Sequence, residues 1–225
     1  YEASTNKEGL ENGIQACDKL IVLSPQWKSF FVNIGIKEMN IIILNNIVTP
    51  PSEEVLEKKR KQNVNMKPQL RFLFLGWLGK RKGIWDLLDV IIAHHKELKG
   101  KFMLRFGGNE FEDKIKKLIV NNHLEDVAQF EGWVSGQKKT ELLEWANCFI
   151  LPSYNEGLPI SILEAMSYGM PVVSTPVGGI TEIVKNGRNG VIVEPGKKEH
   201  IWNALKHYLD NPKYIIVEGK ESLEI

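Results

Sequence analysis

Residues 148–179, CFILPSYNEGLPISILEAMSYGMPVVSTPVGG, contain the pattern on which the rest of the chain depends. The short apolar run Cys148–Leu151 predicts a buried strand, residues 160–168 predict a helix, and Val172–Ser174 predict a second strand. Two buried strands joined by one helix are typical of a parallel β-α-β unit. We therefore expect an α/β fold here.

Two glutamates in this stretch, Glu156 and Glu164, are separated by seven residues. Gly157 and Pro159 oppose a helix until proline takes a first-turn position, so Glu156 is expected in a loop. Glu164 is then expected about one turn into the following helix. The two carboxylates would face the same space from different elements.

This arrangement predicts a particular kind of ligand. A helix that begins near Pro159 leaves the amides of residues 160–162 without intrahelical partners, and its positive dipole end can hold a phosphate. Gly157 lets a ligand approach the backbone closely. Glu164 can accept hydrogen bonds from the vicinal hydroxyls of a ribose, and Glu156 from a sugar beyond the phosphates. The predicted ligand is a nucleotide joined to a sugar.

The same alternation of strands and helices extends on both sides of this stretch. It predicts a Rossmann-like parallel sheet with helices on both faces, and a ligand at the carboxyl ends of its strands. The other expected strands are Leu70–Leu75, Phe102–Phe106, Val127–Phe130 and Val191–Val193, and the other expected helices span residues 84–92, 111–119, 137–146 and 201–209.

The chain as a whole is expected to comprise three parts. Residues 1–50 hold a strand, a helix and a strand, and are expected to be the last β-α-β unit of a domain whose beginning is absent. Residues 51–68 are rich in charge and are expected to form a solvated linker or helix, with a basic patch facing an anionic membrane as the alternative. Residues 69–225 form the main domain.

A basic loop follows the first strand of that domain. Residues 76–83, GWLGKRKG, combine three glycines with three cations, which indicates either an anion clamp or a solvated basic turn. Gly178 and Gly179 form either a tight turn or a second close approach to a phosphate. Trp133 and Val134 lie either beside a nucleotide base or in the core.

Composition excludes several classes of partner and ligand. A net charge of +1 gives no reason to expect nucleic acid as a partner. Cys17 and Cys148 have no CxxC partner and are expected to be reduced core thiols of a cytoplasmic protein. No apolar run reaches the roughly 18 residues of a membrane span. The five histidines lack the spacing of metal ligands.

On these residues, the chain resembles the retaining GT-B glycosyltransferases of family 4, over about residues 16–210. The E-x7-E motif in EGLPISILE, which begins at Glu156, carries the resemblance. In that family two Rossmann-like domains face each other across a cleft, and the C-terminal domain holds the nucleotide-sugar donor. The resemblance implies that residues 69–225 are this donor domain and residues 1–50 the end of the acceptor domain.

The resemblance also implies roles for single residues. Glu156 matches the glutamate that addresses the transferred sugar, and Lys82 matches the lysine that neutralises the diphosphate; both are expected to be catalytic. Glu164 matches the glutamate that holds the ribose. The other donor-binding residues expected here are Gly157, Leu158, Pro159, Lys80, Arg81, Val134 and Gly178.

One position departs from the pattern of the family. Trp77 stands where the family usually has an arginine, in a GR-x4-K pattern. Either Lys80 or Arg81 then supplies the second cation, or the protein binds the diphosphate less tightly.

The activity that the resemblance implies is transfer of a hexose-type sugar, with retention, from a nucleotide diphosphate sugar to a glycan or lipid-linked acceptor. No cofactor and no essential metal are expected, and the chain contains no DxD triplet. Cell-surface polysaccharide synthesis in the cytoplasm, at the inner face of the membrane, is the implied setting. These 225 residues alone are expected to transfer sugar poorly. The alternative is a nucleotide-sugar-binding module without turnover.

Overall fold

The computed structural model describes residues 13–14, 17–64 and 69–225. The chain divides into two units, Tyr1–Asn46 and Ile47–Ile225. Within the described residues, none of the helices has the length and apolar composition that crossing a membrane requires.

The smaller unit contains the predicted β-α-β arrangement. Its strands pair in parallel, with Leu20 opposite Ile41. The helix between them begins as expected, because the Ser24 hydroxyl accepts a hydrogen bond from the amide of Trp27 and proline takes the first helical position. The elements are β1 (Leu20–Val22), α3 (Pro25–Asn33), the 3-10 turn η1 (Glu38–Asn40) and β2 (Ile41–Ile43).

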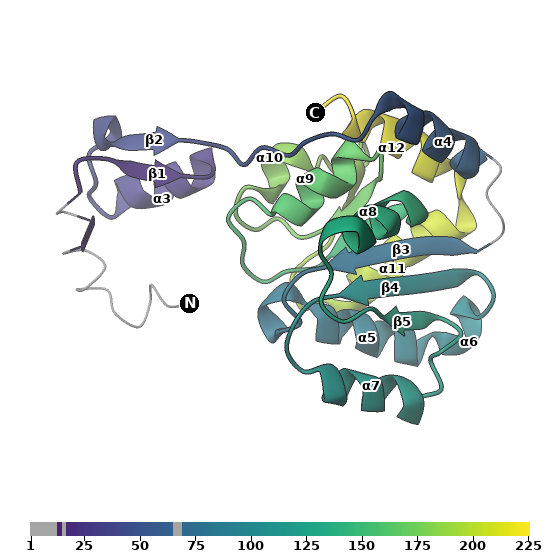
Figure 1. The fold of residues 1–225 in the computed structure, drawn as a ribbon. Coiled ribbons are helices and arrows are strands. Elements are labelled where there is room, and N and C mark those ends of the chain that lie inside the picture. The colour runs from purple at the N-terminus through teal and green to yellow at the C-terminus, as the bar shows by residue number, and fades with distance from the viewer. Residues whose placement is uncertain (1–12, 15–16, 65–68) are drawn as a thin grey trace. The chain divides into compact units, whose positions relative to one another are not determined.

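A six-stranded sheet organises the larger unit, and all its strands are parallel, as predicted. Their order across the sheet is β5-β4-β3-β6-β7-β8 (Figure 1). Each predicted strand is present, with bounds within one residue of those expected. The strands are β3 (Leu70–Leu75), β4 (Phe102–Gly107), β5 (Ala128–Phe130), β6 (Cys148–Leu151), β7 (Val172–Ser174) and β8 (Gly190–Ile192).

Helices cover both faces of this sheet, which confirms the predicted fold class. They are α4 (Glu53–Val64), α5 (Ile84–Ala93), α6 (His95–Leu98), α7 (Glu112–Asn121), α8 (Gly136–Trp145), α9 (Ile160–Ser167), α10 (Ile180–Ile183), α11 (Lys198–Asp210) and α12 (Lys213–Ser222), with a 3-10 turn η2 (Lys80–Lys82). Helices α5 and α11 pack together on one face, whereas α8 and α9 lie on the other (Figure 1). Helix α12 was not predicted.

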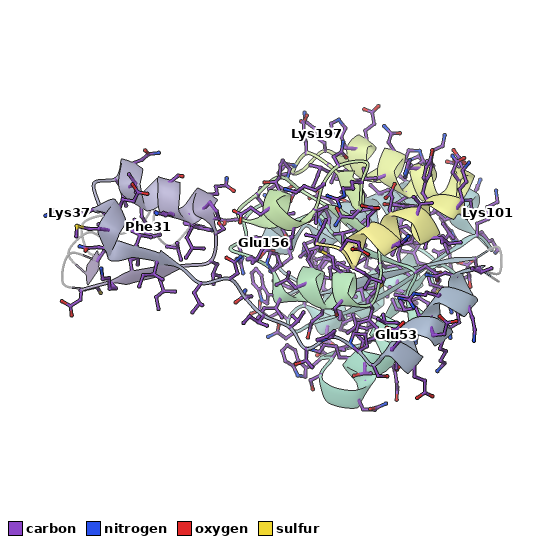
Figure 2. The ribbon with its side chains drawn as sticks, turned by 90° about the horizontal axis from the view of Figure 1, so that it is seen from above. Phe31, Lys37, Glu53, Lys101, Glu156 and Lys197 are labelled. Atoms are coloured by element: carbon purple, nitrogen blue, oxygen red, sulfur yellow. The ribbon has the colours of Figure 1, made fainter. Side chains whose placement is uncertain are left out.

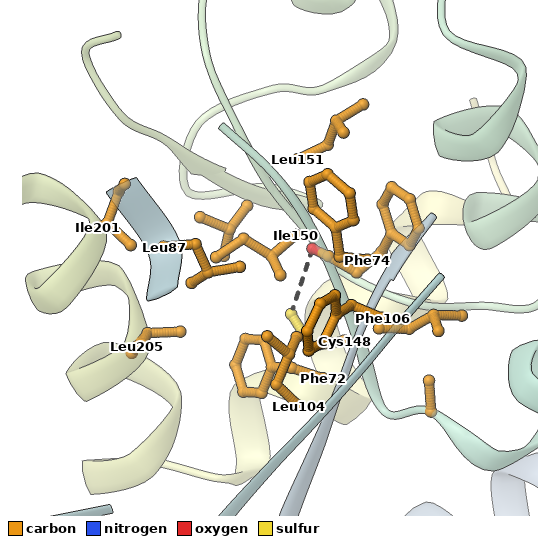
Figure 3. Close-up of a cluster of buried hydrophobic side chains, with 14 of the residues drawn as sticks. Phe72, Phe74, Leu87, Leu104, Phe106, Cys148, Ile150, Leu151, Ile201 and Leu205 are labelled. Carbon is orange, nitrogen blue, oxygen red and sulfur yellow. Dashed lines mark hydrogen bonds between the residues drawn. The ribbon is translucent and has the colours of Figure 1, made fainter. Parts of the chain in front are cut away.

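The core lies between the sheet and these helices. Figure 3 shows Phe72 and Phe74 of β3 beside Cys148 and Ile150 of β6, with Leu205 of α11 nearby. All five side chains are fully buried. Because helices shield both faces, the central strands are continuous apolar runs rather than alternating ones.

The order of the strands creates a crevice at one point of the sheet. The chain runs outward from β3 through β4 to β5, and then returns to place β6 on the other side of β3. The loops after β3 and β6 therefore leave the sheet side by side but turn toward opposite faces. Ligands of open α/β sheets bind at such a topological switch point, outside the carboxyl ends of the strands.

Residues 51–68 differ from the solvated linker that their charge predicted. The part up to residue 64 belongs to the larger unit, and Lys59 and Asn63 of α4 are buried. The Lys59 ammonium donates to the carbonyl oxygens of Leu143 at 2.7 Å and Ala146 at 2.5 Å. It thereby satisfies carbonyl groups at the C-terminal end of α8, which have no intrahelical partner. Residues 65–68 lie outside the described part.

The two cysteines also differ from each other. Cys148 is buried, as predicted, and burial raises the pKa of its thiol well above the ordinary value. Cys17 is exposed and so is not a core thiol, which corrects the expectation. Both are free.

Lys59 predicts a pH dependence of stability. Burial, with a smaller contribution from Arg71, lowers the pKa of its ammonium from 10.5 to about 7. Between these two values the unfolded chain binds more protons, so the free energy of unfolding is fully raised above pH 10.5 and falls as the pH drops to about 7. We expect the wild-type stability minus that of Lys59→Met to rise by roughly 1 kcal/mol per pH unit between about pH 7.5 and 9.

Denaturant unfolding across this pH range provides the measurement. Lys58→Met is the matched control, because Lys58 is the neighbouring residue and its side chain is 63% exposed. The control should show no such slope. A difference between wild type and Lys59→Met that stays constant with pH would contradict the assignment.

Candidate functional site

The loops after β3 and β6 are fastened to each other at the switch point. The amide of Tyr154 donates to the carbonyl oxygen of Arg81 at 2.7 Å. Gly83 adopts a φ of +71°, and a Cβ atom there would lie 2.0 Å from the carbonyl oxygen of Pro152. Only glycine allows the two backbones to come this close. The basic loop and the glutamate loop are thus held as one structure.

Lys82 and Glu156 meet where these loops join. The Lys82 Nζ atom lies 2.7 Å from Oε1 and 2.9 Å from Oε2 of Glu156. The side chains are 14% and 5% exposed, respectively. The hydroxyl of Ser153 donates a further hydrogen bond to Oε1 at 2.6 Å. Figure 2 shows Glu156 and Lys101 toward opposite ends of the larger unit, which places Glu156 at the carboxyl edge of the sheet.

The electrostatics of this pair depend on its burial. A carboxylate removed from water is costly unless it is paired and hydrogen-bonded, and Glu156 has both kinds of partner. An ammonium group carries three N–H donors that can turn toward a new acceptor. An arriving diphosphate would therefore compete with Glu156 for the donors of Lys82.

Glu164, the second glutamate, has a different partner. It lies one turn into α9, as predicted, and its Oε1 accepts from the Nζ atom of Lys139 at 2.5 Å. The structure shows no hydrogen bond from the described residues that joins Glu164 to Lys82 or Glu156. The motif thus forms two ion pairs, each between one glutamate and one lysine.

Lys139 was missed in the sequence. It follows Lys138 at the start of α8, in a first turn that holds no acidic residue. Acidic residues are favoured at that end of a helix and cations are not. Two consecutive lysines at the start of a predicted helix were the signal that could have found it.

The start of α9 is partly as expected. Pro159 is the residue before the first helical position, with φ −66° and ψ 119°, rather than within the first turn. The amide of Ile162, expected to be free, donates to the carbonyl oxygen of Pro159 at 3.2 Å. Among the described residues, the amides of Ile160 and Ser161 show no such bond. Two of the three predicted amides are therefore open to an anion.

Gly178 and Gly179 pack against the glutamate loop. The amide of Gly179 donates to the carbonyl oxygen of Gly157 at 2.6 Å. Gly178 has a φ of +57°, and a Cβ atom there would lie 2.0 Å from the carbonyl oxygen of Glu156. The side chain of Leu158 is buried, so this residue presents its backbone to a ligand. The tight-turn interpretation of the two glycines fits these contacts.

The rest of the basic loop faces solvent. Lys80 and Arg81 are exposed, which leaves both available to an anion. Trp77, which replaces the expected arginine, lies across Gly79: a Cβ atom on this glycine would be 1.9 Å from the tryptophan ring. The indole thus packs on its own loop.

The loop after β5 completes the edge. Val134 packs against the core, and a Cβ atom on Gly107 would lie 2.4 Å from its side chain. The amide of Gly108 donates to the carbonyl oxygen of Gly132 at 2.9 Å. Trp133 is 65% exposed, so it is not a core residue.

No group of three or more metal-ligating side chains occurs within the part of the chain that the structure describes. Metal independence of the chemistry stays a prediction.

The fold and the site together define a Rossmann-like domain of the GT-B class. A family model described as glycosyl transferases group 1 matches residues 55–220. The chain belongs to this family. It covers most of the larger unit, including both ion pairs of the site.

Relatives of the chain carry related names. MJ1069 of Methanocaldococcus jannaschii, an uncharacterized glycosyltransferase, is 26% identical over 91% of this chain and 53% of that protein. WcaL of Salmonella typhimurium, whose name proposes a role as a colanic acid biosynthesis glycosyltransferase, is 34% identical over 68% of this chain and 40% of that protein. The chain thus spans about half the length, or less, of these curated relatives.

Solved structures share the fold. TarM matches with a TM-score of 0.78 and 20% identity, over 98% of this chain and 42% of that chain. WaaG, described as a glycosyltransferase involved in lipopolysaccharide biosynthesis, matches with a TM-score of 0.76 and 20% identity, over 92% of this chain and 57% of that chain. At these identities the likeness establishes the GT-B fold alone.

The close packing of Gly178 predicts an unusually costly substitution. Gly178→Ala must adopt a left-handed conformation and must also displace the Glu156 backbone, so we expect a loss of about 3 kcal/mol or more in the free energy of unfolding. Gly187→Ala is the control, because Gly187 has a similar φ of +72° but no atom within 4 Å of a built Cβ. It should lose only about 1–2 kcal/mol.

Chemical denaturation of both variants measures the difference. Equal losses for the two alanines would show that the contact with the glutamate loop does not constrain Gly178.

Proposed function

We propose that the protein is a retaining glycosyltransferase of family 4 that moves a hexose-type sugar from a nucleotide diphosphate sugar to a glycan or lipid-linked acceptor. The observation that carries the proposal is the buried Lys82–Glu156 pair at the switch point of the sheet. It places a cation for a diphosphate and an acceptor for sugar hydroxyls in one crevice.

The proposed chemistry follows from this geometry. The bond between the sugar carbon and the diphosphate oxygen breaks, and negative charge develops on the leaving oxygen. Lys82 and the free amides of Ile160 and Ser161 stabilise that charge in a preorganised site. The acceptor hydroxyl attacks on the same face, and its proton passes to the leaving phosphate. No metal is needed for this step.

The donor and the acceptor are proposed to bind different parts of the whole protein. Residues 69–225 bind the donor, and the smaller unit is proposed to be the end of the acceptor domain. Relatives support these substrate classes: S. aureus TarM has been crystallised with UDP and α-GlcNAc-glycerol, and Anabaena HepE with UDP-glucose. The names of WcaL and WaaG support a role in cell-surface polysaccharide synthesis.

A nucleotide-sugar-binding module without turnover is the second candidate function. Trp77 favours it, because an indole packed on Gly79 supplies no charge to a diphosphate. Exposed Lys80 and Arg81 favour the enzyme, since either can supply the second cation. Nucleoside diphosphate release from the whole protein that requires an acceptor would establish transfer.

Lys82→Ala tests the proposed site. We expect a loss of about 3 kcal/mol of transition-state stabilisation, or about 100-fold in kcat/KM, because the leaving diphosphate loses its buried cation. Nucleoside diphosphate release by the whole protein gives the rate. Lys101→Ala, toward the opposite end of the unit, is the control and should leave the rate unchanged. A loss under about tenfold for Lys82→Ala would count against the assignment.

The stereochemistry and metal independence of transfer are tested separately. Proton NMR of the product should show the anomeric configuration of the donor, and excess EDTA should leave the rate unchanged. An inverted product would rule out the proposed same-face attack, and a rate restored only by a divalent cation would rule out the metal-independent step.

A further inference from the structure

Two neighbouring lysines at the start of α8 oppose the usual charge preference of a helix. Lys138 and Lys139 lie in a first turn without an acidic residue, where the helix dipole disfavours cations. Each is matched by a carboxylate from another element. Lys138 contacts Glu131, just after β5, and Lys139 contacts Glu164 on α9. Tertiary partners therefore decide both positions.

The two pairs differ in what they leave open. Glu131 is 5% exposed and also accepts from the Nε atom of Arg105, so its carboxylate is fully engaged in the fold. Glu164 accepts from Lys139 through Oε1 only, and the structure shows no hydrogen bond from the described residues to its Oε2. The side chains of Lys139 and Glu164 are 35% and 21% exposed. This second pair can still bind something.

An open ammonium–carboxylate pair has a definite complement. The ammonium has N–H donors left after one is given to Oε1, and Oε2 is an acceptor. A hydroxyl group both donates and accepts, so it can take both sites at once. A pair of vicinal hydroxyls, as on a ribose, would use the donors and the acceptor fully.

We propose that Lys139 is a positioning and specificity residue, which orients Glu164 and donates beside it to a ribose, so that the site selects ribonucleotides over 2′-deoxyribonucleotides. The inference rests on the proposed function, because it assigns the nucleotide end of the donor to this pair. A 2′-deoxyribose would leave the buried side of the pair with an unused donor or acceptor, which a site built for hydroxyls rejects.

Calorimetric titration of the 225-residue chain tests this, with UDP, GDP and ADP and the 2′-deoxy form of each. For the base that binds, we expect wild type to favour the ribose form at least about tenfold. Lys139→Met should reduce this preference below about threefold, and Lys139→Arg, which keeps a cation with several donors, should retain most of it. Lys138→Met, on the same turn, is the matched control and should keep the wild-type preference. Thermal unfolding checks that each variant is folded.

The outcomes separate the inference from the proposed function. Binding of a ribonucleotide with equal affinity for its deoxy form, or a preference unchanged in Lys139→Met, would overturn the role of Lys139 alone. A preference lost equally in Lys138→Met would show that the helix, rather than the Glu164 pair, is responsible, and would overturn it too. Failure of all six nucleotides to bind wild type would overturn both the proposed function and this inference.

Discussion

The contact between Lys82 and Glu156 is the interaction on which the arrangement of this domain's binding edge depends. Neither residue is stable in its position alone, because a buried charge without a partner is far costlier than a paired one. The two lie on loops that leave β3 and β6, which are neighbours in the sheet although 74 residues separate the pair in the chain. The strand order therefore creates the place where the charges can meet.

Backbone contacts keep these loops close enough for the pair to form. Gly83 lies against the carbonyl of Pro152, and Gly178 lies against that of Glu156. Both have positive φ, so two separate requirements, conformation and space, converge on glycine at each position. The loops are thus fixed by the main chain, and the ion pair by the loops. A ligand that took the donors of Lys82 would not need to reorganise the backbone.

The sequence predicted what local pattern determines. The strands of the sheet and helix α9 follow from apolar runs, periodicity and proline, all of which act within a few residues. It did not predict what distant contacts determine. Lys59 reads as one charge in a solvated run, yet its carbonyl partner on Leu143 is 84 residues away. Likewise Glu164 was recognised by spacing, but the position of Lys139 opposite it depends on how α8 packs beside α9.

The charges of the edge explain how acidic residues can line a site for an anion. Two bare glutamates would repel a diphosphate, but each carboxylate is paired with a lysine, so the pairs together carry no net charge. The exposed Lys80 and Arg81 then add positive charge at the same edge, and the start of α9 adds two open amides. With a net charge of only +1 on the whole chain, attraction for an anion must be local. The tryptophan at position 77 is compatible with that attraction because the neighbouring cations replace the charge it lacks.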